Sequence, residues 1–399
     1  MSNPSTDSED VGTAAEGLGA DSRAGQPSDE GKMQFAASPG VPEIIAKLGG
    51  TVLVSTYQAG KLLALRSREG RLSILPRTFV KAMGMAVTGD RIWLCTKNSV
   101  WDLRSCPELA PLIEPAGAHD GCFVPRTSHI TGDMSGHEMA VGVEGAGGAG
   151  GAGGAGGVER PWIVNTRFSC LCTLSPDYNF VPRWKPKFIT ELAAEDRCHL
   201  NGLAMRNGKP ATMSALGDTN VAQGWRERKA SGGVLIDLAS GEIVSRGFAM
   251  PHSPRWQGKP GAERLWVLNS GNGTLQVVDD RTGTAQTVAT FPGYTRGLAF
   301  AGEYAMVGLS KIRETSTFGG LPIADRIKEL KCGVWFVHLP TGRIEGGVEF
   351  GGGITEVFDV QFLPRMRFPS IVGVEKNTID GIFVAPPEAW NGQTPIRLE

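Results

Sequence analysis

A pattern of two short apolar β-runs joined by a turn recurs along most of the chain. One such pair cannot bury its own apolar face, so repeated copies are expected to stack on one another. The sequence contains seven copies: TVLVSTYQAGKLLAL at 51, RIWLCTKNSVWDL at 91, PWIVNTRFSCLCTL at 161, PATMSALG with GGVLIDL from 210, LWVLNSGNGTLQVVD at 265, YAMVGLSKIRE with CGVWFVHL from 304, and SIVGVEKNTIDGIFVA at 370.

A segment rich in small residues precedes most of these pairs. The segments are GMAVTGD at 84, EMAV at 138, GLAMRNG at 202, SPRW at 253, GLAFAGE at 297 and DVQFLP at 359. Glycine and alanine suit the innermost strand of a propeller blade, because such strands crowd around the central axis. A glycine turn and a further run, as in SREGRLSIL at 67, follow the pairs and supply a fourth strand.

These segments together predict an all-β fold, a β-propeller of seven four-stranded blades that occupies residues 34–399 as a single domain. The seventh inner strand is taken from PGVPEIIAKLGG at 39, which aligns with PGYTRGLAFAGE at 292. The same segment also suits a short helix. If it is a helix, the prediction becomes six blades.

Two segments of biased composition interrupt this pattern. Residues 1–33 are rich in Ser, Gly, Asp and Glu and have almost no large apolar side chains, which predicts a disordered tail. Residues 143–158 contain the run GAGGAGGAGGAGG, which predicts a flexible insertion within the propeller.

Charge and composition argue against several classes of protein. Forty basic and forty-one acidic side chains leave a formal net charge of −1, so general nucleic-acid binding is not expected. No apolar run reaches the roughly 20 residues of a membrane span, and the start MSNPSTDSED lacks a signal-peptide pattern. Seven cysteines without CxxC spacing fit reduced thiols in strands. We therefore expect a soluble, cytoplasmic protein without membrane attachment.

The long connections of the repeat fall on one face of the predicted propeller. In a four-stranded blade, the loops between strands two and three and the loops between blades emerge on the same side. Three long loops belong to this group, at about 188–202, 217–233 and 311–330. Because function concentrates in loops held by a rigid scaffold, we expect the site on this long-loop face.

Polar residues stand just before most of the inner strands, at the rim of the predicted channel. The equivalent positions are Glu43, Met83, His137, Asn201, His252, Arg296 and Phe358, with Glu138 and Asp359 one residue further on. His137, His199 and His252 fall in three consecutive blades. Such imidazoles suit a divalent metal with an open position, or acid–base catalysis together with Glu138 or Asp359. The alternative is that they hydrogen-bond to neighbouring loops.

Further polar side chains suit an anionic or sugar-like ligand on the same face. The candidates are Asn165, Arg167, His199, Asn201, Arg255, Arg296, Lys311 and Arg313. Their cations match carboxylates and phosphates through charge-assisted hydrogen bonds, although each also suits an ion pair between blades. Trp225 and Trp256 stand beside arginines and suit either stacking on a ligand or core packing.

Several motifs resemble those of an uncharacterised bacterial family of conserved hypothetical proteins. The matching runs are STYQAGKL at 55, NTRFSCL at 165, CHLNGLAM at 198, GWRE at 224, MPHSPRW at 250, LNSG at 268 and GLSKIRE at 308. The resemblance covers about residues 35–385 and implies no reaction. HLNGLA is also similar to the inner-strand segment of gluconolactonase-like propellers, which bind a divalent metal through Glu, Asn and Asp. On that resemblance, Asn201 matches a metal ligand.

Two functions fit these observations, and the sequence leaves open whether the protein is an enzyme. The first is a binding propeller that holds a polar small molecule or a peptide on its long-loop face. The second is a metal-assisted hydrolase or lyase that uses the three histidines and a divalent metal cofactor. The sequence favours the first, because a fold alone does not imply catalysis. It does not identify the ligand or the oligomeric state.

Overall fold

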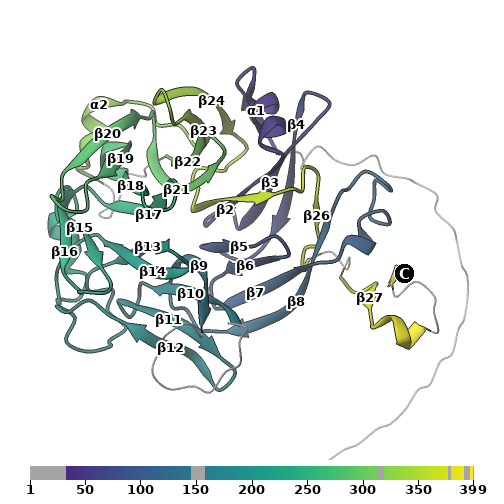
Figure 1. Ribbon diagram of the computed structural model, residues 1–399, viewed down its shortest axis with the longest axis horizontal. Coiled ribbons are helices and arrows are strands. Elements are labelled where there is room, and N and C mark those ends of the chain that lie inside the picture. The colour runs from purple at the N-terminus through teal and green to yellow at the C-terminus, as the bar shows by residue number, and fades with distance from the viewer. Residues whose placement is uncertain (1–32, 145–157, 312–318, 376–378, 391–395, 399) are drawn as a thin grey trace, which may run out of the picture. The chain divides into compact units, whose positions relative to one another are not determined.

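The first six strand pairs each lie in an antiparallel sheet of the computed structural model, which describes residues 33–144, 158–311, 319–375, 379–390 and 396–398 (Figure 1). Residues 1–32 and 145–157, which contain almost all of the predicted tail and the Gly/Ala run, lie outside the described residues. Six sheets form a β-propeller. Their inner strands contact one another in a closed cyclic order, β25, β5, β9, β13, β17 and β21.

Each blade has four strands, ordered from the channel outward. Blade 1 contains β25 (Asp359–Pro364), β2 (Gly50–Thr56), β3 (Lys61–Arg68) and β4 (Arg71–Thr78). Blade 2 contains β5 (Met85–Val87), β6 (Arg91–Cys95), β7 (Ser99–Ser105) and β8 (Cys122–Ile130). Blade 3 contains β9 (Gly136–Glu144), β10 (Val158–Asn165), β11 (Cys170–Ser175) and β12 (Tyr178–Trp184).

The second half of the ring repeats this order. Blade 4 contains β13 (Leu200–Arg206), β14 (Lys209–Ala215), β15 (Gly233–Asp237) and β16 (Ile243–Phe248). Blade 5 contains β17 (Pro251–Gln257), β18 (Arg264–Asn269), β19 (Thr274–Val278) and β20 (Ala285–Thr290). Blade 6 contains β21 (Tyr294–Ala301), β22 (Tyr304–Ser310), β23 (Gly333–His338) and β24 (Arg343–Phe350). Helix α2 (Pro322–Arg326) lies in the long loop between β22 and β23.

The core lies between successive blades, and the strand sequences show why. Successive side chains of a strand point to opposite faces, and both faces of β2 are apolar. Val52 and Val54 pack in a cluster shared with blade 6, whereas Leu53 packs in a cluster shared with blade 2. Fully burying an aliphatic side chain contributes about 1.5–3 kcal/mol, so each blade is held by both of its neighbours.

The prediction of seven blades was wrong, because residues 39–50 do not form an inner strand. They form helix α1 (Val41–Leu48), with Pro42 at its first turn and glycine at both ends. Val41 and Ile45, one helical turn apart, are buried against blades 1 and 6. Glu43 lies exposed on this helix rather than at the channel rim.

The first and last strands join existing blades and do not form a seventh. The last inner strand, β25, pairs with β2 and completes blade 1, so the C-terminal segment closes the ring on the first strand pair. The seventh pair does not form a blade. Its first part, β26 (Ser370–Ile371), adds to the outer edge of blade 2 beside β8, and β27 (Ile382–Val384) pairs with β28 (Ile396–Leu398). At the other end, β1 (Phe35–Ala37) extends blade 6 beside β24.

Glycine alternates with polar side chains around the ring of inner strands. At one equivalent position, in the inner strand or, for Gly84, just before it, the six blades carry Asp359, Gly84, Glu138, Gly202, Ser253 and Gly297, in ring order. A Cβ atom on Gly84 would lie 2.5 Å from the carbonyl oxygen of His137, and one on Gly202 would overlap the Pro254 ring. Neighbouring chain segments therefore approach too closely at these positions for any side chain.

The polar members of this ring bind the backbone of the next blade. Asp359 Oδ2 accepts the amide N–H of Met85 (2.9 Å), and Glu138 Oε2 accepts that of Leu203 (2.8 Å). Ser253 Oγ accepts the amide N–H of Gly297 (3.3 Å). Each bond joins two inner strands that belong to different sheets.

The helices of the described residues are short. None of them is long and apolar enough to cross a membrane.

Gly202→Ala is expected to destabilise the fold by about 1–3 kcal/mol, because the added methyl group overlaps Pro254 and Ser214. Chemical unfolding followed by circular dichroism measures the change. Gly89→Ala is the matched control, since Gly89 is exposed and the nearest atom to its added Cβ is the end of the Arg365 side chain. Equal unfolding midpoints for the two variants would contradict the close-packed ring.

Candidate functional site

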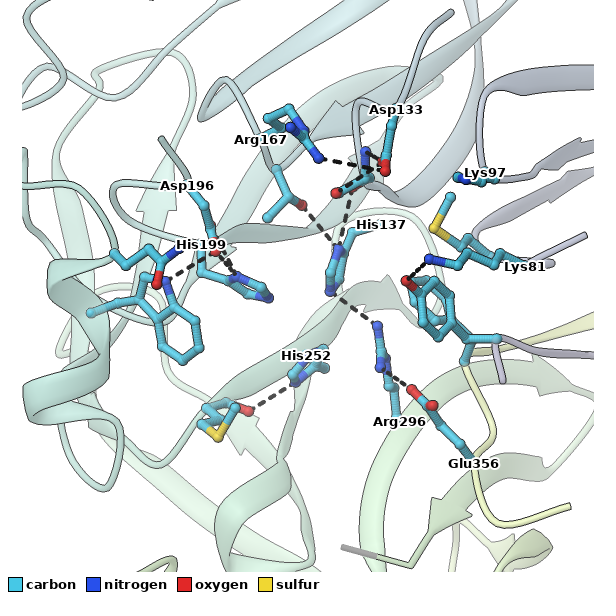
Figure 2. Close-up of a pocket in the computed structure, with 18 of the residues that line it drawn as sticks. Lys81, Lys97, Asp133, His137, Arg167, Asp196, His199, His252, Arg296 and Glu356 are labelled. Carbon is cyan, nitrogen blue, oxygen red and sulfur yellow. Dashed lines mark hydrogen bonds and ion pairs between the residues drawn. The ribbon is translucent and has the colours of Figure 1, made fainter. Parts of the chain in front are cut away.

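A cavity of about 500 Å³ opens at the long-loop face, where the inner strands begin (Figure 2). All six blades contribute to its wall through the two classes of loop that the sequence assigns to this face. The lining includes Tyr57, Gln58, Lys81, Met83, Lys97, Asp133, Ser135, His137, Thr166, Arg167, Glu195, Asp196, His199, Gln223, Trp225, Met250, His252, Tyr294, Arg296, Glu356 and Phe358.

Unusual backbone conformations gather around this cavity. Of the eleven non-glycine residues with positive φ in the described part of the chain, six line it: Lys81, Ser135, Asp196, His199, Gln223 and Met250. A positive φ costs an ordinary residue on the order of 1–3 kcal/mol and persists only where the surrounding structure enforces it. The concentration of such residues makes this cavity the candidate functional site of the described chain.

His137 sits at the centre of the site, with both ring nitrogens engaged. Thr166 donates its only hydroxyl hydrogen to the carbonyl oxygen of Leu200 (2.6 Å), so His137 Nδ1 donates to Thr166 Oγ1 (3.0 Å). His137 Nε2 then carries a lone pair, which accepts a hydrogen bond from Arg296 (3.0 Å). Burial lowers the pKa of His137 well below its usual value, and the charge of Arg296 lowers it further. The imidazole is therefore neutral.

Arg296 is held in place by three partners. Its guanidinium donates to Glu356 Oε1 (2.9 Å), donates to His137, and lies 3.6 Å from the ring centroid of Phe358. Its pairing with Glu356 compensates for its burial, since an unpaired charge at this depth would be strongly unfavourable.

His252 presents a bare nitrogen to the same cavity. Its Nδ1 lies 2.9 Å from the carbonyl oxygen of Met250, which only accepts, so Nδ1 carries the hydrogen. Nε2 then holds a lone pair and has no hydrogen-bond partner among the described residues. Burial and, next, the charge of Arg296 lower the pKa of His252 well below its usual value, so this imidazole is also neutral.

His199 is supported by a carboxylate. Its Nδ1 lies 2.9 Å from Asp196 Oδ2, and the indole N–H of Trp225 donates to the same oxygen (3.2 Å). The Trp225 ring packs on the imidazole with centroids 4.6 Å apart. Within the described ranges, His199 Nε2 has no partner.

Cations complete the wall. Lys81 Nζ donates to the hydroxyl of Tyr57 (3.0 Å), and this bond raises the pKa of Lys81, which is therefore charged. Lys97 has no carboxylate partner in the part of the chain that the structure describes. Arg167, by contrast, pairs with Asp133 (3.4 Å) across the loops of blade 3.

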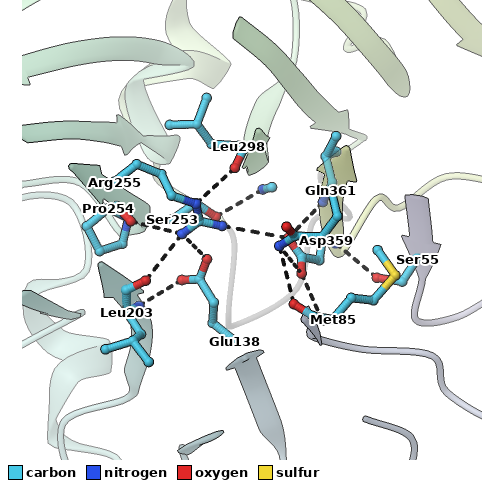
Figure 3. Close-up of polar contacts among 12 residues, drawn as sticks. Ser55, Met85, Glu138, Leu203, Ser253, Pro254, Arg255, Leu298, Asp359 and Gln361 are labelled. Carbon is cyan, nitrogen blue, oxygen red and sulfur yellow. Dashed lines mark hydrogen bonds and ion pairs between the residues drawn. The ribbon is translucent and has the colours of Figure 1, made fainter. Parts of the chain in front are cut away.

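A second polar cluster fills the channel below the cavity (Figure 3). At the position that Arg255 occupies in β17, four of the other inner strands carry alanine. The Arg255 side chain extends into the space that these small residues leave. Its guanidinium pairs with Glu138, lies 4.0 Å from Asp359 Oδ1 and donates from Nε to the carbonyl oxygen of Leu298 (3.0 Å). Burial raises the pKa of Glu138 to about 7 and also raises that of Asp359, against the opposing charge of Arg255.

The three predicted metal-binding histidines share the cavity, but they do not offer three free nitrogens. The ring centroids of His199 and His252 lie 4.8 and 6.1 Å from that of His137. Both nitrogens of His137 are engaged. No group of three or more His, Cys, Asp or Glu side chains in the described segments is placed to hold a metal ion.

A family model described as a domain of unknown function, DUF4915, matches residues 39–372. The chain belongs to this family. The resemblance to an uncharacterised propeller family is thereby confirmed, and the DUF4915 match spans all six blades. None of the curated proteins compared with the chain matches it.

Solved structures similar to this DUF4915 chain share little sequence with it. A chain of the nidogen/laminin complex has 10% identity and a TM-score of 0.50, and the match covers 79% of this chain and 99% of that one. A protein of unknown function from Bacteroides caccae has 7% identity and a TM-score of 0.45, with 79% and 98% covered. Streptogramin B lyase has 13% identity and a TM-score of 0.38, with 82% and 81% covered. The first of these supports the fold alone.

Several predicted ligand-binding residues lie away from the cavity of this DUF4915 protein. Asn165 is buried and accepts the amide N–H of Phe168 (3.1 Å). Asn201 binds Ser214 and the carbonyl oxygen of Pro251. Arg255 lies in the channel, Lys311 is exposed outside the lining, and Arg313 is outside the described residues. Trp256 packs against Arg206 and does not line the cavity.

Other lining residues were missed from the sequence: Lys81, Asp196, Tyr294 and Glu356. Asp196 could have been found from its position three residues before His199, within a loop already assigned to the long-loop face. The remaining three each stand two residues before an aligned rim residue (Met83, Arg296 or Phe358), the spacing that His199 has to Asn201, so the repeat alignment could have found them.

The difference in free energy of unfolding between the wild type and the less stable His252→Gln variant is expected to become smaller as the pH falls below 6.5. His252 is neutral in the folded protein but takes up a proton near pH 6.5 in the unfolded chain, so acid destabilises the wild type more than the variant, which lacks this group. The narrowing is about 1.4 kcal/mol per pH unit, and chemical unfolding from about pH 7.5 to 5.5 measures it. From about pH 7.5 to 9 the gap should stay constant. A gap that does not change below pH 6.5 would show that His252 titrates equally in both states.

Proposed function

We propose that the cavity binds a small polar molecule that carries an anionic group together with hydroxyl or amine groups. The observation that carries the proposal is the presence, in one cavity, of cations that lack carboxylate partners and of imidazoles whose Nε2 atoms have no partner among the described residues. The cations suit the anionic group of such a ligand, and the imidazole nitrogens suit its hydroxyl or amine hydrogens.

The anionic part of the ligand is supported by Lys81 and Lys97. Lys81 is bound only to a neutral phenol, and Lys97 has no acidic partner among the described residues. An ammonium group gains a charge-assisted hydrogen bond from a carboxylate or phosphate, which is about twice as strong as a neutral bond.

The hydrogen-bond donors of the ligand are supported by His199 and His252. Both rings line the cavity; in each, Nδ1 faces an oxygen acceptor and Nε2 has no partner among the described residues. A bound hydroxyl or amine hydrogen would give each of these acceptors a donor. The aromatic rings of Tyr57, Trp225 and Tyr294 add apolar surface beside these groups.

The size of the cavity supports a small molecule over a peptide. About 500 Å³ falls within the roughly 300–1,000 Å³ of typical small-molecule pockets.

Isothermal titration calorimetry with D-glucuronate tests this function, because that sugar acid combines a carboxylate with several hydroxyl groups. We expect glucuronate to bind, and D-glucose and acetate, which each lack one of the two features, to bind more weakly. Lys97→Gln should weaken glucuronate binding roughly fivefold.

Lys47→Gln is the control for this experiment, since Lys47 lies exposed on helix α1 and does not line the cavity. Absence of glucuronate binding to the wild type, or equal affinities for the Lys97 and Lys47 variants, would contradict the proposed function.

A further inference from the structure

Asp196 and His199 form a carboxylate–imidazole pair at the wall of the cavity. Asp196 Oδ2 and Oδ1 lie 2.9 and 3.0 Å from His199 Nδ1, so the carboxylate fixes the hydrogen on Nδ1. The opposite nitrogen, Nε2, is left with its lone pair and has no partner in the described residues. Figure 2 shows the imidazole between Asp196 and His137, within the site.

The surroundings hold this pair in one geometry. Trp225 donates its indole N–H to Asp196 Oδ2 and packs its ring on His199. Asp196 and His199 have φ values of 51° and 48°, a conformation that a histidine adopts only when its neighbours enforce it. The next residue, Arg197, pairs with Glu191 (2.9 Å) and Glu195 (2.8 Å) and ties the loop together.

His252 provides an internal comparison. Its Nε2 is also bare, but its Nδ1 donates to the neutral carbonyl of Met250 rather than to a carboxylate. When an imidazole takes up a proton, an adjacent carboxylate stabilises the resulting cation, whereas a carbonyl does so only weakly. Of the two rings with a bare Nε2, only His199 therefore has a carboxylate in place to hold the imidazolium that proton uptake would form.

We infer that His199 is a general base that removes a proton from an O–H group of the molecule bound in the cavity, with Asp196 as its positioning residue. In this step the O–H bond breaks as the N–H bond forms at Nε2, and the electron pair stays on oxygen. The resulting imidazolium is paired with Asp196, and Lys81 and Lys97 balance the charge on oxygen. No oxidant or reductant is required. The substrate class is a hydroxyl-bearing small anion, so the inference rests on the proposed function.

The test uses diethyl pyrocarbonate, which carbethoxylates unprotonated imidazole nitrogens, on the full-length protein without ligand. Mass spectrometry follows each of the six histidines separately. We expect His199 to react faster than His252. Asp196→Asn should slow His199 at least about tenfold, because the asparagine amide donates to Nδ1 and moves the ring hydrogen to Nε2. Asp196→Glu should restore part of the rate.

Two controls separate this effect from a structural role of Asp196. In the Asp196→Asn variant, the side-chain carbonyl of the asparagine can still accept the indole N–H of Trp225, so circular dichroism should be unchanged. His338→Gln, a change in β23 outside the cavity lining, should leave the His199 rate unchanged.

A wild-type rate for His199 in Asp196→Asn, or a His199 rate no greater than that of His252, would overturn the inference. Because this reaction needs no bound ligand, its outcome is independent of glucuronate binding. Failure of glucuronate to bind contradicts the proposed function, whereas a slow His199 contradicts the general base.

Discussion

The close approach of six inner strands around one channel is the constraint on which the rest of the structure depends. Glycine at three alternate positions removes the side chains that would collide with a neighbouring strand. At the other three positions, Asp359, Glu138 and Ser253 bind an amide of the next blade. The ring is thus joined across sheets by hydrogen bonds that no single blade could make, and it fixes where each inner strand begins.

The site follows from this ring, because its central residues stand one position before the ring residues. His137, His252 and Arg296 are brought together by the strands that carry Glu138, Ser253 and Gly297. Among the ring residues, the carboxylate of Glu138 pairs with Arg255. At the cavity, the guanidinium of Arg296 pairs with Glu356. Burial between these charged layers keeps the imidazoles neutral, with lone pairs available toward the cavity.

The sequence predicted the parts of this arrangement that repeat. Six inner strands, the long-loop face and the meeting of His137, His199 and His252 all follow from aligned segments. The seventh blade failed because residues 41–48 have both a strand-like place in the repeat and a helical spacing of apolar residues, and burial against two blades decides for the helix. Asp196 was missed because loop geometry, which no period encodes, places it. Lys81 was missed because the alignment was not extended two residues back from Met83, where each of the six blades contributes a lining residue.

The central claim is that the ring of inner strands holds the half-buried His137 as a neutral imidazole whose Nε2 accepts a hydrogen bond from Arg296. Long-range proton–nitrogen correlation spectra of protein labelled with ¹⁵N at histidine report the tautomer and charge of each ring directly. The account predicts that His137 stays neutral, with its hydrogen on Nδ1, well below the usual histidine pKa of 6.5. Protonation of His137 near pH 6.5, or a hydrogen on Nε2, would contradict it.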